Sequence, residues 1–217
     1  MPIITLHQAR FSALQPRHAD YQAVLSVDER ERAARLRFDD ARERYVLGRG
    51  WLRHILGERL QRPAAEIRFR YGERGKPGLD HDTPLTFNLA HSGDYLLLAL
   101  AENVSLGVDI EAFRPQPHLR TMARDNFSTK EQAALFALPA DEQLAAFYRI
   151  WTRKEAYIKA TGDGFSLPLT DFDVTHTDPP QIERAGDRWR LLALDLPAGV
   201  IGAMCVGYRG ALTIDEA

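Results

Sequence analysis

A long amphipathic helix followed by strands occurs twice in the sequence, and this order limits the fold more than any other feature. Apolar side chains at helical spacing predict one helix from Asp39 or Asp40 to Leu60 and another from Asp141 to Thr161. Strand-like runs follow each helix, to about residue 101 and about residue 208. The residues show no clear repeat, but the order of elements predicts an α+β fold with two similar α/β halves in a pseudo-twofold monomer.

The two halves are expected to span residues 1–103 and 104–217, with a cleft between them as the site for a ligand. The run Arg114-Pro-Gln-Pro117 breaks the chain and is typical of a linker. A length of 217 residues suits one large domain or two small ones, and it is enough to bury a sizeable core.

Shorter elements are expected around the two long helices. Ser26 with Glu29, and Ser128 with Glu131, have the spacing of a capping box, and the first box opens a helix to about Phe38. The tail after Arg209 is expected to be frayed. The predicted strands are Ile3–Leu6, Glu66–Tyr71, Thr86–Ala90, Tyr95–Ala101, Leu106–Glu111, Phe172–Thr175, Trp189–Leu194 and Val200–Tyr208.

Composition excludes few functions but favours a cytoplasmic setting. The net charge of −2 gives no overall argument for nucleic acid or a membrane surface as partner. The single cysteine, Cys205, cannot form an intrachain disulfide, so a reducing compartment is the expectation. The sequence begins without the charged-then-apolar order of a signal peptide, and its longest strongly apolar run, Tyr95–Ala101, is too short to span a bilayer.

Glu155 interrupts an apolar helical stripe that contains Phe147, Trp151 and Ile158. A carboxylate on such a face is costly to desolvate unless a cation or hydrogen-bond donor pairs with it. One reading is an ordinary surface pair with Lys159, one helical turn further on. The other reading is a functional carboxylate.

A second acidic pair makes the functional reading more specific. Asp109 and Glu111 lie on one face of the predicted strand Leu106–Glu111, opposite its apolar face. They could line a solvent-facing edge, or they could remain ionised around a cation. Together with Glu155 they form an all-oxygen set, which suits Mg²⁺ and, through it, a phosphate or pyrophosphate substrate. The residues alone therefore lead to Mg²⁺-assisted phosphoryl chemistry and no further.

Positive groups for such a substrate are available in two other regions. The turn G-E-R-G-K-P-G at 72–78 can bring backbone N–H groups and Lys76 close to a phosphate, although it could equally be a plain hairpin connection. The region from Asp28 to Arg62 is rich in arginine. It could be an ordinary solvated face or a surface for an anionic partner.

Four motifs in order make the chain resemble the 4′-phosphopantetheinyl transferases, of the long, monomeric type that activates surfactin synthetase. They are F-N-L-A-H-S-G at 87–93, L-G-V-D-I-E at 106–111, F-S-T-K-E at 127–131 and W-T-R-K-E-A-Y-I-K at 151–159. The resemblance implies transfer of the phosphopantetheine arm of coenzyme A to a serine of an acyl or peptidyl carrier protein. Adenosine 3′,5′-bisphosphate would be the other product. A Mg²⁺-dependent phosphohydrolase acting on a nucleotide pyrophosphate is the alternative enzyme, and a non-catalytic carrier-binding module is the third class.

The resemblance also assigns roles to residues. Asp109, Glu111 and Glu155 would hold Mg²⁺, Glu155 would be the base for the carrier serine, and Lys159 would neutralise the pyrophosphate. Asp109, Glu155 and Lys159 would be the catalytic residues. The residues expected to bind coenzyme A are Arg32, Gly75, Lys76, Asn88, His91, Asp109, Glu155 and Lys159.

Two residues depart from the family pattern. Ala90 stands where many members carry serine, and Glu29 stands where some members have a second basic residue. The expectation from these departures is a changed set of contacts to coenzyme A rather than a different reaction.

Overall fold

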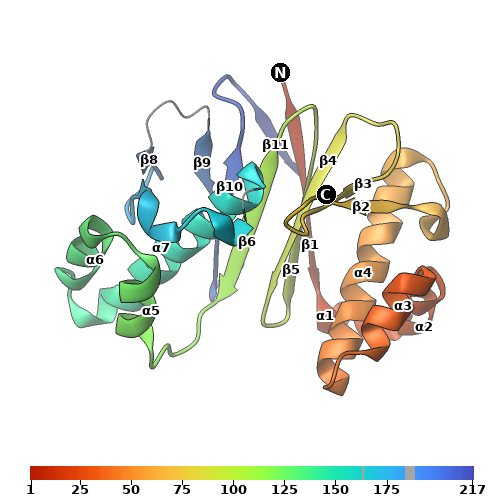
Figure 1. Ribbon diagram of the computed structural model, residues 1–217, viewed down its shortest axis with the longest axis horizontal. Coiled ribbons are helices and arrows are strands. Elements are labelled where there is room, and N and C mark those ends of the chain that lie inside the picture. The colour runs from red at the N-terminus through yellow and green to blue at the C-terminus, as the bar shows by residue number, and fades with distance from the viewer. Residues whose placement is uncertain (163, 184–188) are drawn as a thin grey trace.

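The computed structural model describes residues 1–162, 164–183 and 189–217, and these form two halves of the same architecture (Figure 1). Each half has a three-stranded antiparallel arrangement with a long helix on its outer face, ordered β1-β5-β4 in one and β6-β10-β9 in the other. The α+β fold in two halves is therefore confirmed. The principal elements are β1 (Ile3–Arg10), α4 (Asp39–Leu60), β4 (Leu85–Ser92), β5 (Tyr95–Glu102), β6 (Leu106–Ala112), α7 (Ala140–Thr161), β9 (Arg190–Ala193) and β10 (Val200–Val206).

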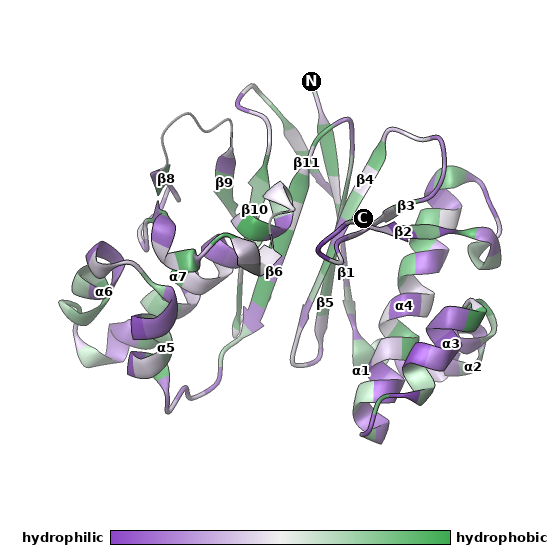
Figure 2. Cartoon of the chain, viewed as in Figure 1, coloured by the Kyte–Doolittle hydropathy of each residue, from purple (hydrophilic) through white to green (hydrophobic). Residues whose placement is uncertain are grey.

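The two sheets meet through an apolar core that joins the halves, with the helices outside (Figure 2). In β5, Leu97 and Ala99 point into this shared core, whereas Leu96 and Leu98 pack in the core beneath α4. A strand buried on both faces has no polar positions, which explains why Tyr95–Ala101 is an uninterrupted apolar run rather than an alternating one. The arrangement is helix, sheet, sheet, helix.

The predicted alternation of β6 is confirmed and fixes the direction of the acidic side chains. Leu106, Val108 and Ile110 lie in the core shared by the two sheets. Because side chains of a strand alternate between its faces, Gly107 and Asp109 face the other way, toward α7.

Short elements connect these layers. Both predicted capping boxes are present, at the start of α3 and of α6. The short helices and strands are α1 (Phe11–Leu14), α2 (His18–Ala23), α3 (Val27–Ala34), β2 (Phe69–Tyr71), β3 (Pro77–Leu79), α5 (Leu119–Asn126), α6 (Thr129–Phe136), β7 (Asp173–Val174), β8 (Ile182–Glu183) and β11 (Thr213–Glu216). Single 3₁₀ turns occupy Gln15–Arg17, Ala64–Glu66, Gly164–Ser166 and Leu169–Asp171.

Three sequence-based expectations about local structure are wrong. The helix that begins after Ser26 ends at Ala34 rather than near Phe38, and the strand predicted from Glu66 begins only at Phe69. The tail after Arg209 is not frayed, because Thr213–Glu216 forms β11, which pairs in parallel with β1. This strand covers the edge of β1, whose N–H and C=O groups would otherwise lack partners. The C-terminal end of the chain thus belongs to the sheet of the first half.

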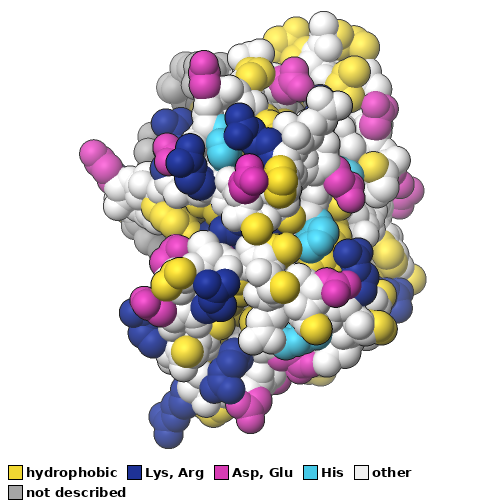
Figure 3. All heavy atoms as spheres, turned by 90° about the vertical axis from the view of Figure 1, so that its right-hand side faces the viewer, with side chains coloured by type: hydrophobic (Ala, Val, Ile, Leu, Met, Phe, Trp, Pro, Cys, Tyr) yellow, Lys and Arg dark blue, Asp and Glu magenta, His cyan; other side chains and the backbone are white. Residues whose placement is uncertain are grey.

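On the arginine-rich face of the first half, basic and acidic side chains are mixed. Figure 3 shows Lys and Arg side chains alternating with Asp and Glu across this side of the molecule. Several of these arginines have partners, including Arg42 with Asp39 at 2.9 Å and Arg59 with Glu102 at 2.7 Å. Such pairs agree with an ordinary solvated face. Among the described residues, no helix combines the length and the apolar character needed to cross a membrane.

Candidate active site

The strand β6 and the helix α7 come into backbone contact at Gly107. A β-carbon at this position would lie 2.3 Å from the carbonyl oxygen of Ala156 and 2.3 Å from the amide nitrogen of Ala160. Backbone atoms cannot give way at such distances, so the strand requires glycine here for close packing. The contact places Asp109, two residues further along the same face of β6, against the last two turns of α7.

Asp109 is the most constrained side chain of the cluster. Only 7% of the residue is exposed, and Lys159 donates to its Oδ1 at 2.6 Å and to the carbonyl of Val108 at 3.3 Å. Its Oδ2 is buried and accepts no hydrogen bond within the described part of the chain. Burial raises the pKa of Asp109 to about 7; the charge and hydrogen bond of Lys159 oppose this shift, and the nearby charges of Glu155 and Glu111 add to it.

Glu155 belongs to the same electrostatic cluster. The residue is half-buried on the face of α7 that is turned toward β6. Burial raises its pKa, the charge of Lys159 lowers it, and the charge of Glu111 raises it again. A carboxyl group with a raised pKa is a better proton acceptor when ionised, which suits a general base. The alternative of an ordinary exposed surface pair with Lys159 does not describe this environment.

Glu111 is oriented by a residue that sequence reasoning missed. Ser92, at the end of β4, donates from Oγ to Oε2 of Glu111 at 2.5 Å, and it accepts a hydrogen bond from the N–H of Ala112 at 3.1 Å. Because the hydroxyl accepts from the backbone, its own proton is directed to the carboxylate. Ser92 follows His91 in the motif H-S-G, and its place in that motif was the available signal.

The carboxylate oxygens are suitable ligands for a hard cation. The three side chains are neighbours, but they do not converge on one point. The buried, unpartnered Oδ2 of Asp109 is an acceptor that a cation would satisfy. The donors are all oxygens, which is the ligand type that Mg²⁺ prefers. Within the ranges that the structure describes, however, no three His, Cys, Asp or Glu side chains stand close enough to hold a metal ion together.

A cavity of about 270 Å³ lies beside this cluster, where the halves meet. Its lining contains five of the residues predicted to bind substrate or metal, and it joins the β2–β3 turn and β4 to the end of α7. The lining residues are Arg74, Gly75, Lys76, Pro77, Asn88, Leu89, Glu155, Ile158, Lys159, Gly162 and Gly164. A ligand in this cavity would touch both halves of the chain.

Two of the predicted coenzyme A residues use their polar groups within the protein. Oδ1 of Asn88 accepts from the N–H of Val108 at 2.8 Å, which ties β4 to β6, and Asn88 is only 6% exposed. Lys76 donates to the carbonyl oxygens of Leu106, Lys159 and Ala160. Gly75 has a φ of +80°, a backbone conformation that favours glycine in this turn.

Arg32 and His91 lie outside the lining of this cavity. The guanidinium of Arg32 is 5.6 Å from the centre of the Tyr45 ring, on an exposed part of α3. His91 packs edge-on against Phe11, with 5.9 Å between ring centroids. Desolvation and the charges of Lys159 and Arg44 lower its pKa, so the imidazole is mainly neutral at pH 7.

Both departures from the family pattern have a structural account. Glu29 is 1% exposed, closes the capping box of α3, and forms ion pairs with Arg49 at 2.6 Å and Arg53 at 2.7 Å. These buried ion pairs account for an acidic residue at this position, and the changed contacts to coenzyme A stay a prediction. Ala90 is 3% exposed and packs in the core shared by the sheets, where a serine hydroxyl would need a buried partner.

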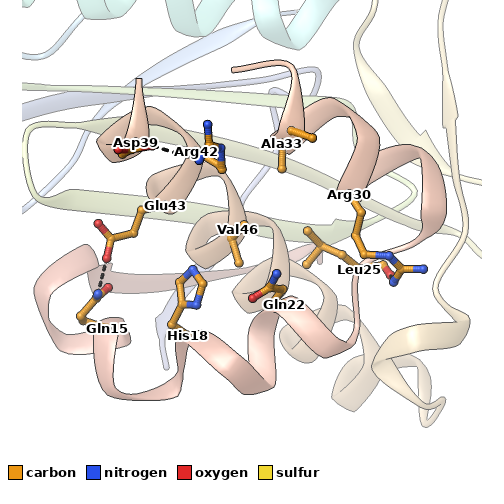
Figure 4. A pocket seen from close by; sticks show the side chains of 11 residues that line it. Gln15, His18, Gln22, Leu25, Arg30, Ala33, Asp39, Arg42, Glu43 and Val46 are labelled. Carbon is orange, nitrogen blue, oxygen red and sulfur yellow. Dashed lines mark hydrogen bonds and ion pairs between the residues drawn. The ribbon is translucent and has the colours of Figure 1, made fainter. Parts of the chain in front are cut away.

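A larger cavity, of about 710 Å³, lies among the short helices and α4 of the first half (Figure 4). Several of its charged and polar groups have partners: Arg42 pairs with Asp39, Gln15 with Glu43, and Arg30 with a backbone carbonyl. None of the predicted catalytic residues lines it. Its size therefore does not make it a better candidate than the smaller cavity at the carboxylate cluster.

Comparisons with known proteins match both halves of the chain. A family model described as the 4′-phosphopantetheinyl transferase superfamily matches residues 105–198, and another, described as 4′-phosphopantetheinyl transferase, N-terminal, matches residues 12–103. The first range includes β6 and α7, which carry the carboxylate cluster. The second includes the β2–β3 turn and β4, which complete the cavity.

Individual relatives give the same result. The chain is 38% identical to the 4′-phosphopantetheinyl transferase HetI of Nostoc sp. (strain PCC 7120) over 195 residues, which cover 88% of this chain and 82% of the relative. It is 44% identical to AcpT of Escherichia coli O157:H7 over 135 residues, 62% and 65% of the two chains. It is 32% identical to Sfp of Bacillus subtilis (strain 168) over 160 residues, 74% and 70% of the two chains. The chain therefore belongs to the 4′-phosphopantetheinyl transferase superfamily and is an enzyme of this type.

Proposed function

We propose that this enzyme transfers the 4′-phosphopantetheine arm of coenzyme A to a serine of an apo acyl or peptidyl carrier protein, with Mg²⁺ held by Asp109, Glu111 and Glu155. The observation that carries the proposal is the coupled cluster of these carboxylates with Lys159, beside a cavity to which both halves contribute. The names of the relatives support the group that is transferred.

In the proposed reaction, the serine Oγ forms a bond to the phosphorus that carries pantetheine. The bond from this phosphorus to the bridging oxygen breaks, and adenosine 3′,5′-bisphosphate leaves. Glu155 accepts the serine proton, directly or through water, and its half-buried carboxylate with a raised pKa supports that role. Bound Mg²⁺ would supply Lewis-acid stabilisation of the pyrophosphate charge.

The remaining residues of the cluster hold the reacting groups in position and neutralise negative charge. Lys159 uses two of its three N–H bonds on Asp109 and the carbonyl of Val108, so one is left for a phosphate oxygen. Ser92 holds Glu111 at its Oε2. Such work by fixed charges and donors is what displacement at phosphorus chiefly requires.

The proposal includes a monomer in a reducing cytoplasm. One chain supplies both walls of the cavity, so no second copy is needed to complete it. The lone cysteine, Cys205, is fully buried in β10, which suits a compartment where thiols stay reduced.

The test is a mass measurement on an apo carrier protein incubated with enzyme, coenzyme A and Mg²⁺. We expect the carrier to gain the mass of one phosphopantetheine at its serine, and the gain to disappear with a chelator. Nucleotide released from coenzyme A without any carrier would favour the phosphohydrolase instead. Carrier binding with no mass gain in any combination would favour the non-catalytic module.

A further inference from the structure

Lys76 reaches from one half of the molecule into the other. It lies in the turn between β2 and β3, and Figure 1 shows this hairpin extending from the side of α4 toward the middle of the molecule. Its ammonium donates to the carbonyl of Leu106 at the start of β6, at 3.1 Å, and to the carbonyls of Lys159 and Ala160 in the last turn of α7, the latter at 3.3 Å. All of these acceptors are backbone oxygens.

Two of these oxygens, those of Lys159 and Ala160, need a donor from outside the helix. The last carbonyls of a helix have no partner within the helix, and they form the negative end of its dipole. A lysine ammonium at that end supplies hydrogen bonds and the favourable charge together. The helix α7 ends in a left-handed residue, Gly162 at φ +79°, and the stem of Lys76 passes beside it.

The geometry leaves Lys76 little capacity to bind a phosphate group. An ammonium has three N–H donors, and three carbonyl oxygens lie within hydrogen-bond distance. A phosphate oxygen would have to displace one of them. No carboxylate pairs with this lysine within the described residues, and burial lowers its pKa to about 8.

We propose that Lys76 is a positioning residue, which clamps the C-terminal turn of α7 to β6 and to the first half and thereby fixes Glu155 and Lys159 relative to Asp109. Lys159 links Lys76 directly to the carboxylate cluster. Its carbonyl accepts from Lys76, while its side chain donates to Asp109 at 2.6 Å. Loss of the clamp would free the turn that carries this ion pair. The kinetic part of the inference rests on the proposed transfer reaction.

A clamp and a coenzyme A ligand predict different kinetics. A residue that binds the substrate equally in the ground state and the transition state changes KM when it is removed. A residue that aligns the base and the neutralising lysine changes kcat, because misplaced groups lose transition-state stabilisation. The sequence-based expectation for Lys76 was the first of these results.

The experiment compares Lys76→Met, which keeps the chain length and removes the ammonium, with Lys76→Arg, which keeps charge and donors. Lys130→Met is the matched control. Lys130 pairs with Glu183 at the surface of α6, on the side of the molecule far from the β2–β3 hairpin (Figure 1). Hydrogen–deuterium exchange is measured for peptides covering Ala156–Gly162 in the protein alone, and steady-state transfer is measured with saturating carrier.

In Lys76→Met we expect exchange across Ala156–Gly162 to accelerate and kcat to fall by about 10-fold or more, with the KM for coenzyme A changed less than about 2-fold. Lys76→Arg should restore most of the kcat, and Lys130→Met should match the wild type in both measurements. A raised KM with unchanged kcat, or unchanged exchange in Lys76→Met, would overturn the proposal.

Two safeguards keep the outcome clear. If Lys76→Met does not fold, Lys76→Gln, a shorter neutral donor, takes its place in the same comparison. If the wild-type enzyme modifies no carrier, the proposed function fails, while the exchange measurement still decides whether Lys76 holds the end of α7.

Discussion

The helices α4 and α7 allow the two halves to be compared residue by residue. Both have 22 residues, and at the same position in each helix stands a buried cation, Arg53 at 2% and Lys154 at 0% exposure. Each cation pairs with a buried glutamate from a capping box of the same half: Arg53 with Glu29 at 2.7 Å, and Lys154 with Glu131 at 2.8 Å. The pseudo-twofold relation thus extends to individual interactions.

The correspondence continues beyond the ion pairs. Arg53 also donates to the carbonyls of Ala64 and Ile67, and Lys154 donates to those of Leu169 and Phe172. In both halves these carbonyls belong to the segment that follows the long helix. A buried charge with several hydrogen-bonding partners fixes a helix in one rotation and one register.

The halves differ at the next position along each helix. Glu155 follows Lys154 in α7 and faces the carboxylate cluster, whereas His54 follows Arg53 in α4 and packs edge-on against Tyr21. Glu58 stands in α4 at the position that Lys159 holds in α7, and its charge acts on His7 of β1, whereas Lys159 pairs with Asp109. The scaffold is thus repeated, and in the described residues the three-carboxylate cluster occurs in one copy.

The largest effect, on kcat, is expected from a change at Glu155. Glu155→Gln should lower kcat by about 10² to 10⁴-fold, the range for loss of a general base, while carrier binding stays nearly intact. His54→Gln, the matched change in α4, should leave kcat within about 2-fold of the wild type, because the contacts of His54 with Gly50 and Tyr21 lie within the first half. Steady-state kinetics and a carrier-binding titration separate these results. Equal losses of kcat in both variants would contradict a single site.

Loss of either buried glutamate should be the next largest effect. Glu131→Gln and Glu29→Gln each leave a buried cation without its counter-charge, which costs about 3–5 kcal/mol of unfolding free energy in comparable cases. Urea unfolding of both variants measures the cost, and exposed Glu183→Gln is the control. A loss in one half only would show that the two pairs are not equivalent in energy, despite their geometry.

The next smaller effect is expected at two glycines, one in each half, where a long helix packs closely against another element. Gly107→Ala would place a β-carbon 2.3 Å from backbone atoms of α7, and Gly50→Ala would place one 2.3 Å from Cβ of Tyr21. Both changes should destabilise the protein by about 1–3 kcal/mol or more through overpacking. At a temperature where both variants are folded, only Gly107→Ala should lose activity, since it displaces the turn that carries Glu155. Activity lost equally in Gly50→Ala would mean that the halves are mechanically coupled.

The elements that sequence reasoning placed correctly are those defined by local patterns. Apolar periodicity located the two long helices and β5, and the spacing of Ser26 to Glu29 and of Ser128 to Glu131 gave both caps. Glu155 was singled out because a carboxylate on an otherwise apolar face needs an explanation, and Asp109 with Glu111 because two carboxylates share one face of a strand. In each of these patterns the residues lie close together in the sequence, so the pattern can be recognised without the structure.

The features that sequence reasoning missed depend on partners distant in the chain. The strand β11 forms because β1, some two hundred residues earlier, has a free edge. The repeated ion pairs were hidden because one half uses arginine and the other lysine, and a buried charge cannot be told from an exposed one without its partner. The partners of Lys76 could not be predicted for the same reason: glycine and proline around it indicate a turn, but not which carbonyl oxygens its ammonium contacts.

The smallest effect concerns pH, and here the two halves should respond with opposite sign. Asp109 has a folded-state pKa of about 7, above its ordinary value of 3.8, so the folded state binds more protons than the unfolded state between these values. Its contribution to stability is therefore present at low pH and is lost as the pH rises toward 7, by at most about 1.4 kcal/mol per pH unit. His7 has a lowered pKa, chiefly from burial, so its contribution is lost as the pH falls. In metal-free protein, urea unfolding at pH 5 and pH 7 should show that Asp109→Asn removes a decrease of stability with rising pH, whereas His7→Gln removes an increase.

Saturating Mg²⁺ should flatten the wild-type decrease as well, because a cation on Asp109 favours the ionised carboxylate in the folded state. If Mg²⁺ changes the slope of Asp109→Asn as much as that of the wild type, the buried oxygen of Asp109 is not where the cation binds.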